Sequence, residues 1–281
     1  FPIWFFQGIQ KMRYITILNM SGRICTMLGI FLLVKSPDDY ILAAFLQACT
    51  PLIAGVFSIV WLRKHYTGLF KWPTIGEIIN SYKEGWSIFV SSLAVNLYTA
   101  TNVVVLGMLT NNVIVGYYSA ADKLITCVRR GIYAVSDAIY PFISKMMKDN
   151  IPKGLQFIKK QLLLYLVVGL VGCTSLFFFS DTIVKLLFGA DYNLTVDVLR
   201  ILSFVPLAVA ISTVFGEETM LPLNMNSAYS RTLVLAAFFS LLSIFPLCYL
   251  WGAKGVAMTM LLTEFLIMII MGGLLRKQLF Q

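Results

Sequence analysis

Charged residues are scarce in this chain, and their scarcity excludes an ordinary soluble globular protein. Asp, Glu, Lys and Arg make up 12% of the 281 residues, whereas soluble domains average roughly 25%. Hydrophobic residues make up 59%, and the mean hydropathy is +0.83. Apolar runs near the length of about 20 residues that a membrane helix needs recur from end to end. The composition therefore indicates an all-α integral membrane protein with several spans.

Groups that catalyse reactions or hold cofactors are also missing. The single histidine, His65, follows Arg63 and Lys64, where it is placed to meet lipid headgroups rather than to catalyse. No Walker motif, CxxC motif or Cys/His cluster occurs, so we expect no enzyme, no metal site and no other cofactor. The five cysteines are far apart in apolar segments and are expected to be buried free thiols: Cys25, Cys49, Cys127, Cys173 and Cys248.

Long polar stretches and a secretory signal peptide are absent as well. Without a polar stretch there is no candidate for a soluble domain, and the first residue is Phe1 rather than Met. We therefore expect the chain to begin inside a longer protein. The formal charge of +9 would suggest a nucleic-acid partner in a soluble protein, but here positively charged cytoplasmic loops explain it. Membrane lipids are the expected surroundings, and nucleic acid is not an expected partner.

Eight apolar spans are predicted, joined mostly by short loops. They cover residues 14–34, 40–62, 86–109, 113–143, 161–180, 195–215, 231–250 and 255–275. If residues 1–13 are cytoplasmic, the inner loops hold fourteen Lys and Arg residues and the outer loops hold three. Such an excess is typical of cytoplasmic loops, so both ends of the chain are expected to be cytoplasmic.

The inner loop before residue 86 contains a helix signal of its own. Thr74 and Glu77 form a capping-box pattern, and apolar residues follow at helical spacing: Ile75, Ile78, Ile79 and Tyr82. This pattern predicts a short amphipathic helix in the cytoplasmic interface. The predicted organisation is two helices over 1–69, an amphipathic linker over 70–85 and a six-helix domain over 86–281.

Basic residues inside the predicted spans are the main indication of function. Each costs roughly 2.5–3.5 kcal/mol near the bilayer centre, so a membrane helix rarely keeps one without a use. They are Arg23, Lys123, Arg129, Arg130 and Arg200. Because Arg and Lys bind phosphate oxygens, they predict a cavity for an anionic group such as phosphate or pyrophosphate. Arg23 and Lys123 lie near mid-span, whereas the other three could also snorkel to the interface or form structural pairs.

The predicted span 113–143 carries most of these charges on one side. Polar residues recur there every seven residues in two adjoining stripes, Asp122, Arg129 and Ser136, and Lys123, Arg130 and Asp137. Such a face is expected to turn towards protein or water. In span 86–109, polar side chains are candidates for sugar contacts or for hydrogen bonds between helices: Asn96, Tyr98, Thr99, Thr101 and Asn102.

Acidic residues in the spans are candidates for coupling transport to an ion gradient. Asp122, Asp137 and Glu264 are the three that we single out, because an intramembrane acid is a candidate proton or sodium site. The alternative for Glu264 is a hydrogen bond to a neighbouring helix. Glu217 and Glu218 are expected to be solvated at the cytoplasmic end of a span.

Two segments resemble a known family of transporters. Residues 1–12 read FPIWFFQGIQKM and resemble the P-x-W-x-x-Q-G-x-x-K-M stretch of the O-antigen flippases of Wzx type. Residues 115–123 read VGYYSAADK and resemble the V-G-x-Y-S-x-A-x-K segment of that family. Tyr140-Pro141 with the basic loop that follows also fits. These polysaccharide exporters belong to the superfamily that includes the multidrug exporters.

The resemblance implies a fold and an activity. It implies that the chain holds the last two helices of an N-terminal six-helix lobe and the whole of a C-terminal six-helix lobe. The family moves undecaprenyl-pyrophosphate-linked oligosaccharides to the periplasmic leaflet of the bacterial inner membrane by alternating access, with ion coupling expected. The implied partners are this lipid-linked substrate and other polysaccharide assembly proteins. Arg23, Lys123, Arg129 and Arg130 would then contact its anionic headgroup.

Three alternatives remain open at the level of sequence. A multidrug or cation antiporter of the same superfamily would favour an acidic cavity, whereas the predicted interior is basic. A membrane glycan polymerase or ligase would need a large external loop and catalytic groups, and neither is found in the sequence. A chain that lacks the first four helices of the family could also be inactive by itself.

Overall fold

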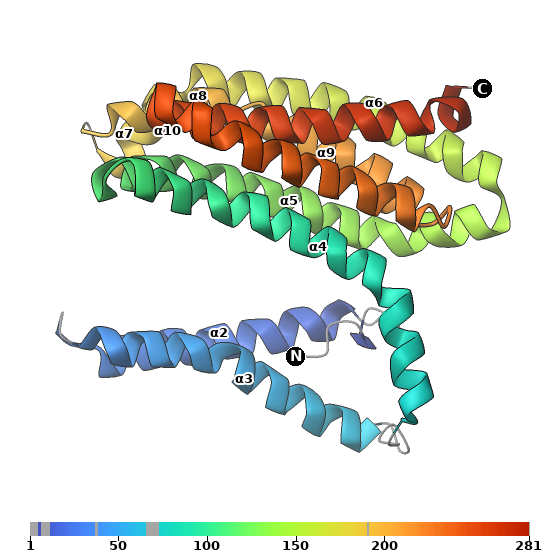
Figure 1. Cartoon of the computed structure of the whole chain (residues 1–281). Coiled ribbons are helices and arrows are strands. Elements are labelled where there is room, and N and C mark those ends of the chain that lie inside the picture. The colour runs from blue at the N-terminus through green and yellow to red at the C-terminus, as the bar shows by residue number, and fades with distance from the viewer. Residues whose placement is uncertain (1–4, 7–11, 37–38, 66–72, 190, 281) are drawn as a thin grey trace. The chain divides into compact units, whose positions relative to one another are not determined.

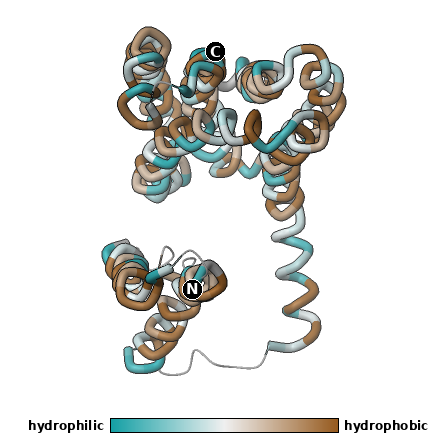
Figure 2. Tube along the Cα trace, turned by 90° about the vertical axis from the view of Figure 1, so that its left-hand side faces the viewer, coloured by the Kyte–Doolittle hydropathy of each residue, from teal (hydrophilic) through white to brown (hydrophobic). Residues whose placement is uncertain are grey.

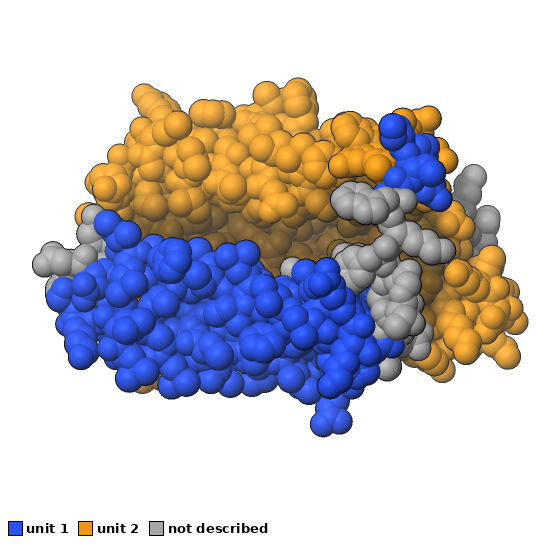
Figure 3. All heavy atoms as spheres, turned by 90° about the horizontal axis from the view of Figure 1, so that it is seen from below, with its two compact units in different colours: residues 1–77 blue, residues 78–281 orange. Residues whose placement is uncertain are grey.

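The computed structural model describes residues 5–6, 12–36, 39–65, 73–189 and 191–280. The described residues form helices and short turns and contain no β-strand, as the composition predicts for an all-α membrane protein. Hydrophobic residues run along the helices of the chain (Figure 2). The chain divides into two compact units, residues 1–77 and 78–281 (Figure 3). The boundary falls inside the predicted linker 70–85, and whether the units are lobes of a larger transporter stays a prediction.

The first unit contains a helical hairpin of α2 (Met12–Leu33) and α3 (Tyr40–His65) (Figure 1). The helices approach closely at Gly22, where an added Cβ would lie 3.2 Å from the carbonyl oxygen of Thr50. Beside this contact the hydroxyls of Thr26 and Thr50 are 2.6 Å apart. Small and hydroxyl-bearing residues at the crossing are typical of helix pairs in membranes, where close packing replaces the hydrophobic effect.

A capped helix follows as the sequence predicts, but it does not stop at residue 85. Helix α4 (Ile75–Leu109) runs from the predicted linker directly into the third span. The carboxylate of Glu77 accepts hydrogen bonds from the Thr74 backbone N–H at 2.7 Å and from the Thr74 hydroxyl at 2.8 Å. These bonds lower the pKa of the Glu77 carboxyl. Residues 75–85 of the predicted linker are thus the first part of a long helix, because no residue between 75 and 109 interrupts the helical pattern.

The other helices of the second unit are joined by short connections. They are α5 (Asn112–Asp149), α6 (Ile151–Phe178), α7 (Ser180–Phe188), α8 (Asn193–Leu202), α9 (Val205–Phe215), η2 (Gly216–Met220) and α10 (Asn226–Phe280). Asn111 and Asn150 begin α5 and α6, since the side chain of each accepts a backbone hydrogen bond from the first turn. Helix α7 falls in the segment 180–194, for which the sequence predicts an outer loop.

Helix α9 is the centre of this unit. Its residues Val205–Val214 are all buried, and it packs against α5, α6 and α10. A helix that is apolar all round is typical of such a position. Pro206 is tolerated because it lies in the first turn, where a missing N–H breaks no helical bond.

Helix α10 contains two of the predicted spans and folds back on itself (Figure 1). The reversal occurs at Gly252, whose φ of 55° is in the left-handed region. At Gly255 a Cβ would overlap the carbonyl oxygen of Leu247, so only glycine fits this approach of the two arms.

Two hydrophobic clusters fill the interior of the second unit. One surrounds Tyr118, Leu199 and Met260, and the other surrounds Ile158 and Ile267. Glu264 lies between Met260 and Ile267 along α10. A carboxyl group is therefore placed where the two apolar clusters adjoin.

Six segments of the described chain are long and apolar enough to cross a membrane. They are Thr16–Leu33, Ile41–His65, Ile88–Leu109, Ile151–Phe178, Asn193–Met220 and Asn226–Arg276. The last segment contains two of the predicted spans. The fourth predicted span corresponds to α5, which carries several charged residues and is not among the six. The count of eight therefore depends on whether α5 crosses the membrane with its polar residues turned towards protein.

Candidate functional site

The two polar stripes of α5 face different surroundings. Asp122, Arg129 and Ser136 form what we call the inward stripe, because Arg129 and Ser136 bond to side chains of other elements and Asp122 is half-buried. Lys123, Arg130 and Asp137 form the outward stripe, and all three are exposed. The seven-residue spacing predicts each stripe, and packing against α8, α9 and α10 decides which one is covered.

Arg129 is held by an acid from α10. Its Nη2 lies 3.5 Å from Oε1 of Glu264, and the two side chains are 11% and 4% exposed. The hydroxyl of Tyr98 on α4 donates to the same carboxylate oxygen at 3.1 Å. Arg129 also donates to the hydroxyl of Tyr133, at 3.5 Å. The sequence left open whether Arg129 forms a structural pair and whether Glu264 bonds to another helix. The structure shows both contacts.

The other basic residues of the spans are more accessible. Arg23 on α2 and Lys123 and Arg130 on α5 are exposed, and none has an ion-pair partner among the described residues. Arg200 donates from Nε to the hydroxyl of Ser180 at 3.1 Å. Among the described residues of the second unit, an acid therefore pairs with Arg129, whereas Lys123 and Arg130 stay exposed without one.

A second polar cluster surrounds Glu218, and here the sequence-based expectation is wrong. Instead of being solvated, Glu218 is 0% exposed. The hydroxyl of Ser136 and Nε2 of Gln161 donate to its two carboxylate oxygens, each at 2.6 Å. No signal in the sequence marks Gln161, because a lone glutamine in an apolar helix belongs to no motif. The turn from α9 through η2 buries Glu218, and a sequence pattern does not show such a turn.

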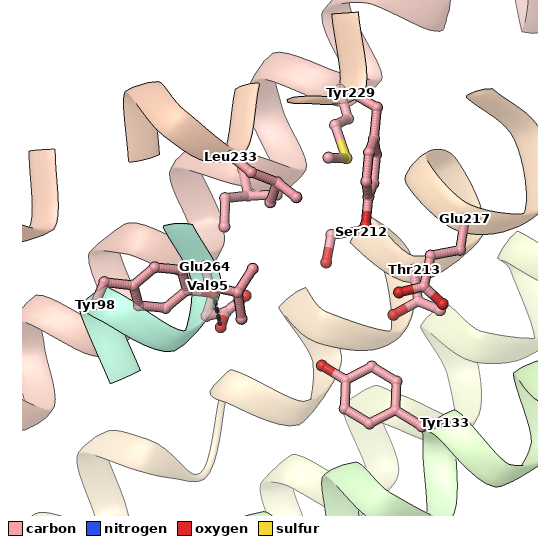
Figure 4. Close-up of a pocket in the computed structure, with 11 residues that line it drawn as sticks. Val95, Tyr98, Tyr133, Ser212, Thr213, Glu217, Tyr229, Leu233 and Glu264 are labelled. Carbon is pink, nitrogen blue, oxygen red and sulfur yellow. Dashed lines mark hydrogen bonds between the residues drawn. The ribbon is translucent and has the colours of Figure 1, made fainter. Parts of the chain in front are cut away.

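Tyr98, Tyr133 and Glu264 of the first cluster, with Glu217 beside the second, border a pocket. Its empty volume is about 370 Å³, part of it open to the outside. Polar lining residues come from five elements: Tyr98, Tyr133, Ser212, Thr213, Glu217, Tyr229 and Glu264. Figure 4 shows the rings of Tyr133 and Tyr229 reaching towards the space between them, with Glu217 beside it. The pocket thus presents two carboxylates and several hydroxyls. One of the carboxylates, Glu264, is paired with Arg129.

The remaining candidates have varied surroundings. In the α4 polar set, Tyr98 bonds to another helix, whereas Asn96 and Thr99 bond to carbonyls of their own helix. All five cysteines are free, although Cys25 and Cys127 are exposed rather than buried. Within the described ranges, no cluster of His, Cys, Asp and Glu could hold a metal ion.

Long apolar helices around an internal ion pair and an open polar pocket define a multi-pass α-helical membrane protein. Its residues 1–147 match the family of polysaccharide biosynthesis proteins. The chain therefore belongs to that family, which confirms the resemblance indicated by its sequence motifs.

Three relatives show how much of the family's length the chain covers. It is 31% identical to the "Putative O-antigen transporter" of Escherichia coli K12, over 95% of this chain and 64% of that protein. A protein of the same name from Shigella dysenteriae is 30% identical, over 96% and 68%. The "Probable low-salt glycan biosynthesis flippase Agl15" of Haloferax volcanii is 25% identical, over 85% and 50%. The chain thus spans about half to two thirds of each relative. No solved structure matches it significantly.

Proposed function

We propose that this chain is part of a flippase that moves a lipid-linked oligosaccharide from the cytoplasmic to the periplasmic leaflet of a bacterial inner membrane. The names of the relatives, O-antigen transporter and glycan biosynthesis flippase, support this class of activity. Family membership supports polysaccharide assembly as its setting, with other assembly proteins as partners. The substrate that fits is an undecaprenyl-pyrophosphate-linked repeat unit, whose lipid tail stays in the bilayer while its headgroup crosses through protein.

The observation that carries the proposal is the outward stripe of α5. Lys123 and Arg130 expose two positive charges on a helix whose other side is packed in the unit. An exposed guanidinium or ammonium in a membrane protein can bind phosphate oxygens without first breaking an internal ion pair. Arg23 on α2 is exposed in the same way. We assign headgroup contacts to Lys123 and Arg130 in the second unit, and Arg23 is the candidate in the first.

Arg129 has a different part in this proposal. An anionic headgroup must compete with Glu264 for the guanidinium, and the ion pair between them is long at 3.5 Å. Displacement of Glu264 would leave a carboxylate without a cation, and a buried carboxylate in that state takes up a proton or another cation. Exchange at this pair would couple headgroup binding to an ion gradient during alternating access. Asp122 and Asp137 are the other candidates for the coupling ion.

Substitution of the outward stripe tests the proposal. In cells that depend on the full-length protein, Lys123→Gln combined with Arg130→Gln should reduce surface polysaccharide about tenfold or more. The loss of one charge-assisted hydrogen bond alone is worth about 1.5–3 kcal/mol. Lys148→Gln is the matched control, because Lys148 is an exposed base on the same helix but lies about five turns beyond Arg130, in the last turn of α5. Normal polysaccharide from the double variant, at normal protein level, would contradict the assignment.

One observation favours a cation antiporter as the second candidate. Among the described residues, the pocket is lined by Glu217 and Glu264 and by no basic residue, which suits a cationic substrate. The same cells distinguish the two functions. An antiporter would alter susceptibility to cationic drugs when Glu217 is replaced by Gln, and it would leave surface polysaccharide unchanged in every variant.

A further inference from the structure

The π-helix η2 follows α9 and contains two adjacent acids, Glu217 and Glu218. In η2 the backbone N–H of Leu221 bonds to the carbonyl of Gly216, five residues earlier, at 3.1 Å. Such turns are rare and frequently occur at functional sites. Glu217 lines the pocket, whereas Glu218 points between α5 and α6, where it meets Ser136 and Gln161. The turn therefore places one carboxyl group in an open space and its neighbour in the interior.

The hydrogen-bond partners of Glu218 are neutral, and no cation pairs with it in the part of the chain that the structure describes. The groups that act on it are Ser136 of α5 and Gln161 of α6, with Tyr165 of α6 nearby. The titratable groups around Glu217 are all acids or phenols: Tyr133, Asp137 and Tyr140 of α5, Glu218 of η2 and Tyr229 of α10. Helix α9 contributes the neutral Ser212 and Thr213 to the pocket. No Lys or Arg among the described residues pairs with either acid.

An ionised Glu218 would be poorly stabilised in these surroundings. A buried carboxylate needs a paired cation or a metal, and otherwise it takes up a proton and becomes neutral. The acid also follows the C-terminal end of α9, where the partial negative charge of the helix disfavours a second negative charge. Burial, helix polarity and the neighbouring acid Glu217 therefore all favour the protonated form.

The Gln161 amide gives independent geometric support. Its Nε2 lies 2.6 Å from the carboxylate, which is short for an N–H···O bond but ordinary for O–H···O. Its Oε1 and the hydroxyl of Tyr165 are buried without a hydrogen-bond partner, and Gln161 is 6% exposed. The oxygen and nitrogen of an amide can exchange places by a half-turn of the group. A turned amide would accept the proton of a neutral Glu218 through its carbonyl oxygen.

We propose that Glu218 is a proton-binding site and that Glu217 passes its proton to and from the pocket. On release, the O–H bond of the Glu218 carboxyl breaks and an O–H bond forms on the Glu217 carboxylate, so one negative charge moves from pocket to interior. Return of the proton reverses both changes, and no other reactant is needed. The use of this proton to drive transport rests on the proposed flippase function, whereas the proton site itself does not.

Infrared spectroscopy of the full-length protein in liposomes tests the site. A protonated carboxyl group has a stretching band that a carboxylate lacks, and ordinary Glu residues lose this band well below pH 7. We expect the band to persist at about pH 7 in the native protein and to be lost in Glu218→Gln. This variant keeps the size of the side chain and can still accept from Ser136, so its folding is preserved. Glu218→Asp should retain a titrating band.

Asp197→Asn is the control, because Asp197 is a carboxyl of the same unit but is paired with Lys254 at 2.8 Å. It should leave the band at about pH 7 unchanged. A band that is absent from the native protein at this pH, or one that survives in Glu218→Gln, would overturn the proton site.

Transport by the same liposomes separates this proposal from the proposed function. With a lipid-linked oligosaccharide as substrate, transport by the native protein should change with a pH gradient, and the change should be lost in Glu218→Gln. A protein that has the band but does not transport this substrate would contradict the flippase function and support the site. Transport with no band would contradict the site, and a pH response intact in Glu218→Gln would contradict the use of this proton to drive transport.

Discussion

At the scale of single residues, the position of a charge relative to the fold decides its chemistry. Arg129 and Arg130 are neighbours in sequence, yet Arg129 is paired with Glu264 inside the unit and Arg130 is exposed. Adjacent residues on a helix point about 100° apart, so packing on one side separates them. The same holds for Glu217 and Glu218, one in the pocket and one buried. Burial makes the stability of the protein depend on the pairing of Arg129.

Removal of one member of this ion pair should therefore destabilise the protein more than removal of both. Glu264→Gln leaves Arg129 buried without a counter-ion, and loss of one partner from a buried pair costs about 3–5 kcal/mol. The double variant Glu264→Gln, Arg129→Met has no lone charge and should recover most of this loss. Thermal unfolding of the purified protein in detergent measures both effects.

Lys123→Gln is the control on α5, since Lys123 is exposed and unpaired among the described residues. It should change the free energy of unfolding by less than about 0.5 kcal/mol. If Glu264→Gln proved as stable as this control, the ion pair would not be a structural contact.

At the scale of elements, the sequence predicts the helices well and their continuity less well. Residues 74–84 and 86–109 carry separate signals, an amphipathic pattern and an apolar run, yet they form the single helix α4. Conversely, the apolar stretch 195–215 is divided into α8 and α9 by turns at Ser203 and Phe204. Hydropathy reports the solvent that a segment prefers, whereas backbone continuity depends on local hydrogen bonds and packing. Reversals in the chain are therefore best tested at the residues that permit them.

Gly255 is such a residue in α10. Gly255→Ala should open the hairpin and destabilise the second unit by several kcal/mol, since the new Cβ would overlap the carbonyl oxygen of Leu247. Gly273→Ala is the matched control in the same helix, because a Cβ there meets nothing within 4 Å. It should be neutral or slightly stabilising. Comparison of the unfolding temperatures of the two variants checks this, and equal values would contradict the close approach of the arms.

At the scale of the whole molecule, the distribution of Lys and Arg predicts an orientation in the membrane. Fourteen of these residues fall in the predicted inner loops and three in the outer ones, so both ends of the chain are expected to be cytoplasmic. By this prediction, Ser36 follows the first span on the outer side and Lys148 follows the fourth span on the inner side. The orientation therefore predicts which of the two is accessible from outside the cell.

Labelling with a membrane-impermeant thiol reagent checks this orientation. In a full-length protein without its native cysteines, Ser36→Cys should be labelled in intact cells, whereas Lys148→Cys should be labelled after the membrane is opened. Both positions are exposed in the structure, so access depends on the membrane alone. The reverse pattern would require the opposite topology.

The sequence by itself determined the class of protein, its helices and the face of α5 that carries its charges. It could do so because the preference of apolar runs for lipid and the periodicity of a helix are local properties. The tertiary structure decided which charges are paired, because ion pairs join residues as distant in sequence as Arg129 and Glu264. It also decided that the turn after α9 buries Glu218 and leaves Glu217 in the pocket. Burial and pairing arise only when several helices pack together, and they set the chemistry of each charged group.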